Sequence, residues 1–234
     1  MSDLMLETLA DGLGALELTL DGAVLEKLCA FARAMVKQNE VMNLTGITED
    51  APVAKLHLLD SLTVASCVDL KNKTLIDVGC GAGFPGVPLA IACPDTKVTL
   101  LDSLGKRMKW LEEVLPTLGI SAQCVTARAE EAVADCRETY DVATSRAVAR
   151  LNILLELTAP YVKLGGFVVA LKGSAAKEEL AEAKNAIKKL GLSLVEVREF
   201  TFDGASHGVI VLKKIAPTPA VYPRRFAKIK QNPL

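Results

Sequence analysis

The chain has 234 residues, of which 50% are hydrophobic and 24% are charged, and its formal net charge is −1. This length and composition are typical of a globular protein with one substantial domain. No apolar run approaches the roughly 18 residues that a membrane-spanning helix needs, and the acidic N-terminus does not resemble a secretory signal. We therefore expect a cytoplasmic protein that does not associate with membranes.

The cysteines do not indicate a metal site or a disulfide framework. The six cysteines are scattered along the sequence, without a Cys-x-x-Cys pair, and only two histidines accompany them. Zinc sites and disulfide-rich domains show closer and more regular spacing. Scattered cysteines of this kind are typical of a reducing compartment, and we expect no bound metal.

Charge is unevenly distributed along the chain. The segment from Lys213 to the C-terminus has six basic residues and no acidic one, so residues 1–212 carry 21 basic against 28 acidic side chains, a net charge of −7. A basic tail on an acidic body can bind nucleic acid, but many such tails are only solvated. Charge alone leaves both interpretations open.

Residues 1–70 predict helices and no strand. Asp21 is suited to cap a helix in which apolar side chains recur at helical spacing up to about Asn39. Asp50, followed by a proline in the first turn, predicts a second helix that runs to about Val68. We expect these residues to form a helical cap on the rest of the chain.

From residue 71 to residue 214, short apolar strands alternate with helices, and residues 215–234 form the basic tail. The predicted strands are Leu75–Val78, Val98–Leu101, Ala122–Thr126, Val142–Ser145, Phe167–Leu171, Leu194–Arg198 and Val209–Leu212. The predicted helices are Pro85–Ala92, Lys106–Leu118, Glu130–Cys136, Leu151–Val162 and Ala176–Leu190. This alternation predicts an α/β fold with a mostly parallel sheet covered on both faces. The last two strands are joined by only Glu199–Gly208, which is too short for a helical crossover and predicts an antiparallel pair.

A glycine-rich stretch follows the first predicted strand. Gly79, Gly81 and Gly83 occupy alternate positions, and Pro85 then opens a short apolar helix. A strand, a glycine turn and a helix in this order are typical of a nucleotide-binding site, because glycine permits positive φ angles and close approach of a ligand. Both G-x-G-x-x-G from Gly81 and G-x-G-x-G from Gly79 fit. A dinucleotide site would place its first glycine directly after the strand, at Gly79.

The second predicted strand ends in Asp102, 23 residues after Gly79. A carboxylate at this place can accept hydrogen bonds from both ribose hydroxyls of an adenosine, which NAD and S-adenosylmethionine share. The antiparallel ending favours S-adenosylmethionine, because class I methyltransferases end their sheet in this way, whereas a nicotinamide oxidoreductase needs a sheet that continues in parallel. Asp77 fits the acidic position of the methyltransferase motif Glu/Asp-x-Gly-x-Gly-x-Gly. A turn that merely links strand to helix is the remaining alternative.

Five motifs carry a resemblance to a known family. They are Asn43 to Thr45, His57 to Ser61, Ile76 to Gly86, Leu101 to Arg107 and Ser145 to Ala149. In order and spacing they resemble the bacterial glucose-inhibited division protein B family, from about residue 20 to residue 213. Members of that family are S-adenosylmethionine-dependent methyltransferases of a guanine N7 in 16S ribosomal RNA. The resemblance implies a class I methyltransferase fold, with a seven-stranded, mostly parallel sheet whose last strand is antiparallel.

The resemblance also implies which residues bind the cofactor. In the family, the positions that match Gly79, Phe84, Ala129, Glu130 and Arg146 line the S-adenosylmethionine site. Together with the residues of the glycine motif and the second strand, the predicted cofactor site is Asp77, Gly79, Gly81, Gly83, Phe84, Asp102, Ala129, Glu130 and Arg146. As a hypothesis, Asp102 holds the ribose, and Ala129 and Glu130 meet the adenine.

Several basic side chains are candidates for contacts with 16S ribosomal RNA or the small ribosomal subunit. They are His57, Lys106, Arg107, Lys172, Arg224 and Arg225. Lys106 and Arg107 begin a helix, where cations oppose the helix dipole, so an RNA phosphate would account for them. A solvated helix face is an equal alternative. His57 shares a helical face with Asp60 and Ser61, and a structural network between cap and core explains it as well as RNA contact does.

The implied reaction needs no general base, because guanine N7 has a lone pair and no proton. Catalysis then depends on positioning and on accommodating the positive charge that moves from sulfur to the base. We predict no catalytic acid–base residue and expect a monomer. Two alternatives stay open: a class I methyltransferase of another substrate, and an RNA-binding or cofactor-sensing protein without turnover.

Overall fold

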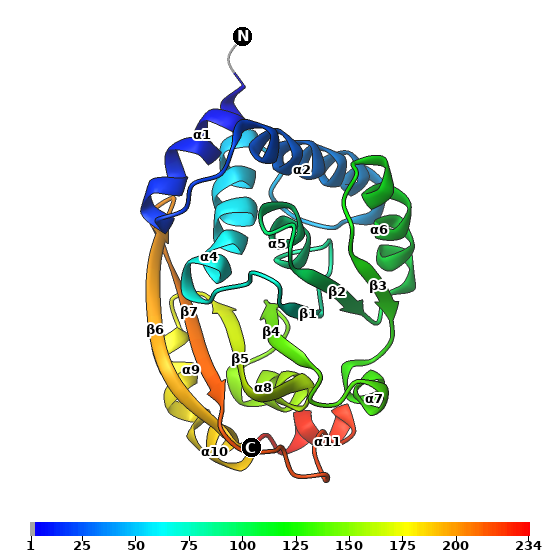
Figure 1. Ribbon diagram of the computed structural model, residues 1–234, viewed down its shortest axis with the longest axis vertical. Coiled ribbons are helices and arrows are strands. Elements are labelled where there is room, and N and C mark those ends of the chain that lie inside the picture. Colours follow the sequence, from blue (N-terminus) through cyan, green and yellow to red (C-terminus); the bar gives the residue numbers. More distant parts are fainter. Residues whose placement is uncertain (1–2) are drawn as a thin grey trace.

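A central sheet lies between two layers of helices in the computed structural model, which describes residues 3–234 (Figure 1). The sheet has seven strands in the order β3-β2-β1-β4-β5-β7-β6. The strands are β1 (Thr74–Val78), β2 (Lys97–Asp102), β3 (Gln123–Thr126), β4 (Tyr140–Arg146), β5 (Val162–Lys172), β6 (Leu192–Phe202) and β7 (Ala205–Lys214). The predicted α/β class with a seven-stranded sheet is confirmed.

Strand direction also follows the prediction. The pairs from β3 to β5 are parallel, and β7 is antiparallel to both of its neighbours, β5 and β6. The hairpin differs in extent, because β6 and β7 continue through Glu199–Gly208 to a turn at Asp203 and Gly204. The φ angles of these two residues, 54° and 77°, are those of a two-residue type I′ turn, for which Asp-Gly is a favoured pair.

One face of the sheet is covered by helices that come mostly from the N-terminal third. They are α1 (Leu4–Gly12), α2 (Gly22–Met42), α3 (Asp50–Val53), α4 (Asp60–Cys67), α5 (Gly86–Ala92) and α6 (Gly105–Thr117). Asp21 caps α2 as predicted, since its carboxylate accepts a hydrogen bond of 2.9 Å from Val24 N. The predicted second helix is interrupted, because a π-helical turn over Ala54–Leu59 separates α3 from α4. Helix α1 was not predicted.

The opposite face is covered by helices from the C-terminal half. They are α7 (Ala129–Ala132), α8 (Leu151–Thr158), α9 (Ala176–Glu182), α10 (Lys184–Lys189) and α11 (Phe226–Gln231). Three predicted helices are shorter than expected. The helix predicted over Glu130–Cys136 ends at Ala132 and is followed by a 3-10 turn. The one from Leu151 ends at Thr158, followed by a 3-10 turn and then β5, and the one from Ala176 breaks at Ala183.

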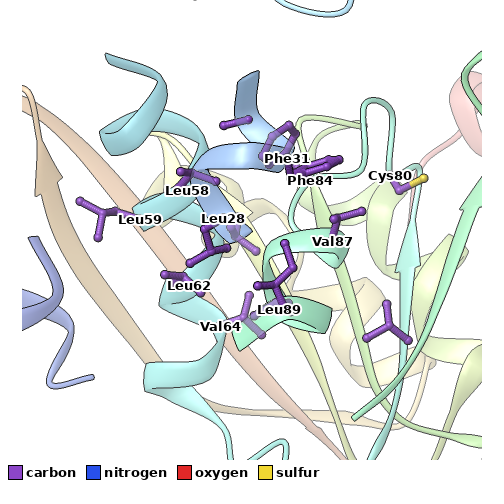
Figure 2. Packing of buried hydrophobic residues seen from close by; sticks show 14 of the residues in the cluster. Leu28, Phe31, Leu58, Leu59, Leu62, Val64, Cys80, Phe84, Val87 and Leu89 are labelled. Atoms are coloured by element: carbon purple, nitrogen blue, oxygen red, sulfur yellow. The ribbon is translucent and has the colours of Figure 1, made fainter. Parts of the chain in front are cut away.

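A hydrophobic core joins the N-terminal helices to the glycine turn after β1 (Figure 2). Phe31 of α2 and Phe84 of the turn are buried, and their ring centroids lie 5.4 Å apart. Leu28 of α2, Leu62 of α4 and Val87 of α5 are fully buried in the same core. Each such side chain contributes roughly 2 kcal/mol on burial. Apolar packing therefore holds the N-terminal helices against the glycine turn.

The C-terminal residues fold back onto the helical face that contains α8. Nε and Nη2 of Arg224 donate hydrogen bonds of 2.8 and 2.6 Å to the two carboxylate oxygens of Glu156, whose side chain is fully buried. Lys214 is also buried, and its Nζ lies 3.1 Å from Glu138 Oε1. The segment expected as a basic tail is thus fixed by ion pairs at its start and its middle.

Removing the Arg224 guanidinium should destabilise the protein. We expect Arg224→Ala to lower the free energy of unfolding by about 3 kcal/mol, because the buried Glu156 carboxylate loses its partner. Equilibrium denaturation measures the change, with Arg225→Ala as the matched control, since Arg225 is the exposed neighbour. Equal stability of the Arg224 variant and the parent would contradict this reading.

Candidate functional site

A cavity of about 370 Å³ lies at the C-terminal ends of β1, β2 and β4. Parallel α/β sheets bind their ligands at this edge. Seven of the nine predicted cofactor residues line the cavity: Gly79, Gly81, Phe84, Asp102, Ala129, Glu130 and Arg146. Leu44 and Thr45, from the loop after α2, and His57 close it from the side of the N-terminal helices.

The other two predicted residues lie behind the glycine turn. Asp77 is fully buried, and its Oδ2 accepts a hydrogen bond of 2.7 Å from Gly86 N. Its Oδ1 has no hydrogen-bond partner among residues 3–234, and burial raises the pKa of Asp77 to about 7. Gly83 has a φ of 95°, and a Cβ there would lie 2.7 Å from Val87 Cγ2. Both residues shape the turn from its core side.

The backbone amides of the glycine turn donate to the protein itself. Gly79 N and Cys80 N donate to Leu101 O at 2.7 and 3.1 Å, which ties the turn to the end of β2. The amides of Gly81, Gly83, Phe84 and Gly86 also donate to protein oxygens. A phosphate-binding loop needs its amides free to meet the phosphate oxygens. Most amides of the turn are therefore unavailable to a ligand, which favours close approach of a ligand without phosphate here.

Asp102 forms the wall of the cavity beside this turn. Its Oδ2 accepts a hydrogen bond of 2.9 Å from Gly81 N, and its Oδ1 accepts one of 2.8 Å from Leu104 N. A carboxylate has about four acceptor sites, so each oxygen retains capacity for a ligand hydroxyl. Ala127 N donates to Asp102 O at 3.2 Å, which places the segment leading to Ala129 beside Asp102.

Arg146, at the end of β4, connects the sheet to the N-terminal helices. Its Nη1 donates to Leu56 O at 2.8 Å and to Asp60 Oδ2 at 2.9 Å. Its Nη2 lies 3.3 Å from His57 Nδ1, and its guanidinium lies 5.2 Å from the centroid of the Phe84 ring. The π-helical turn supplies Leu56 and His57, so the irregular backbone at this point brings these groups to Arg146.

Asp60 is the centre of this polar network. The residue is 4% exposed, and its Oδ1 lies 2.9 Å from Nδ1 of His207 on β7. Burial alone would raise the pKa of Asp60, but the hydrogen bond from His207 and the charge of Arg146 hold it below the ordinary value. Sequence reasoning missed His207, because it lies 147 residues away in a strand without a recognisable motif.

His57 takes part in the same network. Burial, with the positive charge of Arg146, lowers the pKa of His57 to about 4, so the imidazole is neutral near pH 7. Its Nε2 lies 2.8 Å from Thr45 Oγ1, and its ring stacks on Phe84 with centroids 5.0 Å apart. These contacts join the N-terminal cap to the core, which is the structural network predicted from the sequence as one alternative for His57. A contact of His57 with RNA stays a prediction.

Two of the predicted RNA-binding cations are engaged inside the protein. The Lys172 side chain is mostly buried, and its Nζ lies 2.9 Å from Glu179 Oε2 and donates to Ala149 O. Arg224 is paired with Glu156. These contacts account for both cations without a nucleic acid.

Other cations surround the mouth of the cavity. Arg107 and Arg128 line it, while Lys106 and Arg225 are exposed next to the lining residues Arg107 and Phe226. In the described part of the chain, none of these four cations forms an ion pair. Arg128 was not among the predicted residues, because it follows a short strand outside the recognised motifs.

Residues 3–234 contain no group of three or more His, Cys, Asp or Glu side chains arranged to hold a metal ion. None of the helices in this range has the length and apolar character needed to cross a membrane.

Comparison with known proteins identifies the family. The family model described as rRNA small subunit methyltransferase G matches residues 24–206. This chain belongs to that family. A ribosomal RNA small subunit methyltransferase G from Alkaliphilus metalliredigens is 43% identical over 232 residues, which cover 97% of each chain. One from Desulfitobacterium hafniense is 43% identical and covers 94% of this chain and 93% of the relative. The predicted family is confirmed.

Solved structures show the same fold at low sequence identity. A precorrin-6y C5,15-methyltransferase from Geobacter metallireducens has a TM-score of 0.54 at 15% identity, covering 74% of this chain and 92% of its own. A 16S rRNA (adenine(1408)-N(1))-methyltransferase from Catenulisporales acidiphilia, solved with SAM, has a TM-score of 0.54 at 16% identity, covering 63% and 87%. The class I methyltransferase fold is confirmed.

The stability contribution of His57 should depend on pH. The folded pKa of about 4 lies below the ordinary 6.5, so the unfolded chain binds more protons between these values. Stability from neutral His57 is therefore lost as the pH falls from 6.5 towards 4. The raised pKa of the buried Asp77 makes the protein more stable as the pH falls through this range. This contribution is present in both the parent and the variant, so it cancels in their difference.

We expect the parent to be more stable than His57→Gln by a smaller margin at low pH than at neutral pH. Between about pH 7.5 and about pH 5, the difference in free energy of unfolding should shrink by about 2 kcal/mol. Urea denaturation of both proteins at the two pH values measures it. An unchanged difference would show that His57 is not buried in its neutral form.

Proposed function

We propose that this protein transfers a methyl group from S-adenosylmethionine to N7 of a guanine in 16S ribosomal RNA, free or within the small ribosomal subunit, in the cytoplasm. The observation that carries the proposal is the cavity at the C-terminal edge of the sheet. Its glycine turn permits close approach and has most of its amides bonded to protein oxygens, and the cavity wall carries the Asp102 carboxylate. Membership of the family supports ribosomal RNA as the substrate.

The residues of the cavity fit this cofactor. Asp102 would accept the ribose hydroxyls, and Ala129 and Glu130 would meet the adenine. Gly81 has a φ of +57°, and a Cβ there would meet nothing nearer than Arg107 Nη1 at 3.7 Å, so the turn leaves space for the ligand. When bound, S-adenosylmethionine supplies an electrophilic methyl group on a positively charged sulfur.

The acceptor base would enter beside Thr45 and His57, which line the same cavity as Asp102 and Ala129. During transfer, positive charge moves onto the guanine ring, so uncompensated cations on this side would oppose the reaction. His57 is neutral, and the charge of Arg146 is balanced by Asp60. These residues therefore position the base in a site of low net charge, and none of them needs to remove a proton.

The free cations at the mouth of the cavity would hold the RNA backbone. Lys106, Arg107, Arg128 and Arg225 are available there for phosphate oxygens. Phosphate contacts supply affinity and orient the RNA, and they make binding depend on salt concentration. We leave Lys172 and Arg224 out of this surface because each is paired with a glutamate.

The decisive experiment supplies the purified protein with methyl-labelled S-adenosylmethionine and two substrates that lack the modification, naked 16S ribosomal RNA and small subunits. Label recovered as 7-methylguanosine at one site is the expected result. Label on another nucleoside, or on a protein or small molecule, would support the alternative methyltransferase. No label in any substrate would support a binding protein without turnover.

Asp102 should control cofactor affinity. We expect Asp102→Ala to raise the Kd for S-adenosylmethionine at least about 10-fold, because hydrogen bonds to a charged acceptor are lost. Isothermal titration calorimetry measures this, with Asp95→Ala as the control, since Asp95 is exposed at the opposite edge of the sheet. A thermal melt without ligand checks that the turn survives the loss of Asp102. A folded variant with the affinity of the parent would show that Asp102 does not hold the ribose.

Arg107 should contribute a phosphate contact. Arg107→Gln is expected to weaken binding of 16S ribosomal RNA and to reduce the slope of log K against log salt by about 0.7–0.9. The control is Lys97→Gln, because Lys97 is exposed at the start of β2, at the other edge of the sheet. Filter binding over a salt series distinguishes the two variants. An identical slope in the Arg107 variant and the parent would remove Arg107 from the RNA surface.

A further inference from the structure

We propose that the C-terminal segment, residues 215–234, completes the cofactor cavity by placing Phe226 against the adenine of S-adenosylmethionine. The proposal rests on the proposed function, which identifies the ligand. Phe226 begins α11 and lines the same cavity as Asp102, Ala129 and Glu130. The family model matches only residues 24–206, so this wall lies outside the matched region.

The segment leaves β7 through a buried polar junction. Lys214 Nζ donates to Ala159 O at 2.8 Å and lies 3.1 Å from Glu138 Oε1, with its side chain fully buried. Thr218 is also buried, and its backbone N donates to the same Glu138 oxygen at 2.7 Å. One carboxylate thus holds both the end of the strand and the start of the segment.

The middle of the segment is fixed by two arginines. Arg137 donates to Thr218 O and Tyr222 O, both at 2.8 Å, and thereby clamps the backbone between them. Arg224 is held by the buried carboxylate of Glu156 through its side chain and also through its backbone N at 2.8 Å. Beyond it, Ile229 is fully buried and anchors α11.

These anchors distinguish the segment from a solvated tail. A tail that met RNA by charge alone would keep its cations in water, because taking a charge out of water is unfavourable unless it is paired. Here two cations are withdrawn from water and paired, and the residue directly after Arg224 and Arg225 is Phe226. The buried pairs therefore fix the backbone at the point where the aromatic ring reaches the cavity.

Phe226 faces the cavity rather than a hydrophobic core. It is only partly buried. Tyr222 and Leu234 of the same segment pack against the core of the C-terminal helices, but Phe226 is not among the side chains of either core described for residues 3–234. Its helix, α11, contacts α8, which supplies Leu157 to the cavity, and lies near α7, which begins at Ala129 (Figure 1). An aromatic ring at this place offers a face on which a purine can stack.

The test compares two replacements of Phe226 with the parent by their Kd for S-adenosylmethionine in isothermal titration calorimetry on the full chain. Phe226→Leu keeps apolar bulk without an aromatic face, and we expect it to raise Kd about 5- to 30-fold. Phe226→Tyr should bind within about twofold of the parent, since it restores the ring. The control is Val221→Ala, because Val221 is an exposed apolar residue of the same segment, and its Kd should not change.

A second readout does not depend on the stability of the leucine variant. The parent has one tryptophan, Trp110, which is buried. In Phe226→Trp, the new indole should change its fluorescence on addition of S-adenosylmethionine, after the signal of the parent is subtracted.

The outcomes separate this inference from the proposed function. If the parent binds S-adenosylmethionine and Phe226→Leu binds equally tightly, or if Tyr and Leu weaken binding equally, Phe226 does not stack on the adenine and the inference is wrong. An unchanged indole signal at saturating cofactor would overturn it as well. Failure of the parent itself to bind S-adenosylmethionine would instead overturn the proposed function.

Discussion

The buried ion pair between Asp60 and Arg146 is the interaction on which the site depends. Asp60 belongs to the N-terminal helices, Arg146 ends β4, and His207 on β7 completes the coordination of the carboxylate. Removing one partner from such a pair leaves an uncompensated charge, which costs about 3–5 kcal/mol. The remaining contacts of Arg146 direct its guanidinium over Phe84, whose ring packs on Phe31 in the core. Three regions of the chain that are distant in sequence are thus locked around one side of the cavity.

The same arrangement fits the proposal that one side of the cavity accepts a base and the other side accepts a cofactor. On the proposed acceptor side, ion pairing of Arg146 and burial of His57 keep the net charge low. On the proposed cofactor side, the amides of Gly79, Cys80 and Gly81 hold the turn against β2, and the Asp102 carboxylate retains capacity as an acceptor. A phosphate would find no row of free donors there, whereas a ribose would find an acceptor. This preference for a ribose over a phosphate follows from which amides of the turn already donate hydrogen bonds, and not from the glycines alone.

Much of the fold was predictable because its determinants are local. Neighbouring residues determine the strand and helix periodicity from residue 71 onward, the Asp21 cap and the short link before β7. The spacing between Gly79 and Asp102 is likewise visible within a short stretch of sequence. The parts that were not predictable depend on partners far away in sequence. Lys172 and Arg224 looked like free cations because Glu179 and Glu156 reach them only in the fold. His207 has no motif, and the π-helical turn that presents His57 has no signature in the residue pattern.

The C-terminal segment shows how far charge counting can mislead. Of its basic residues from Lys213 onward, Lys214 and Arg224 hold the backbone through buried pairs, while Lys213, Arg225, Lys228 and Lys230 remain exposed. Arg225, Lys228 and Lys230 flank or lie within α11, the helix that begins with Phe226 at the cavity. One short helix therefore carries both an aromatic side chain that lines the cavity and exposed cations. The basic character of the segment and its packing are thus parts of one arrangement. Lys214 and Arg224 fix the helix through buried pairs, and the other cations face the solvent.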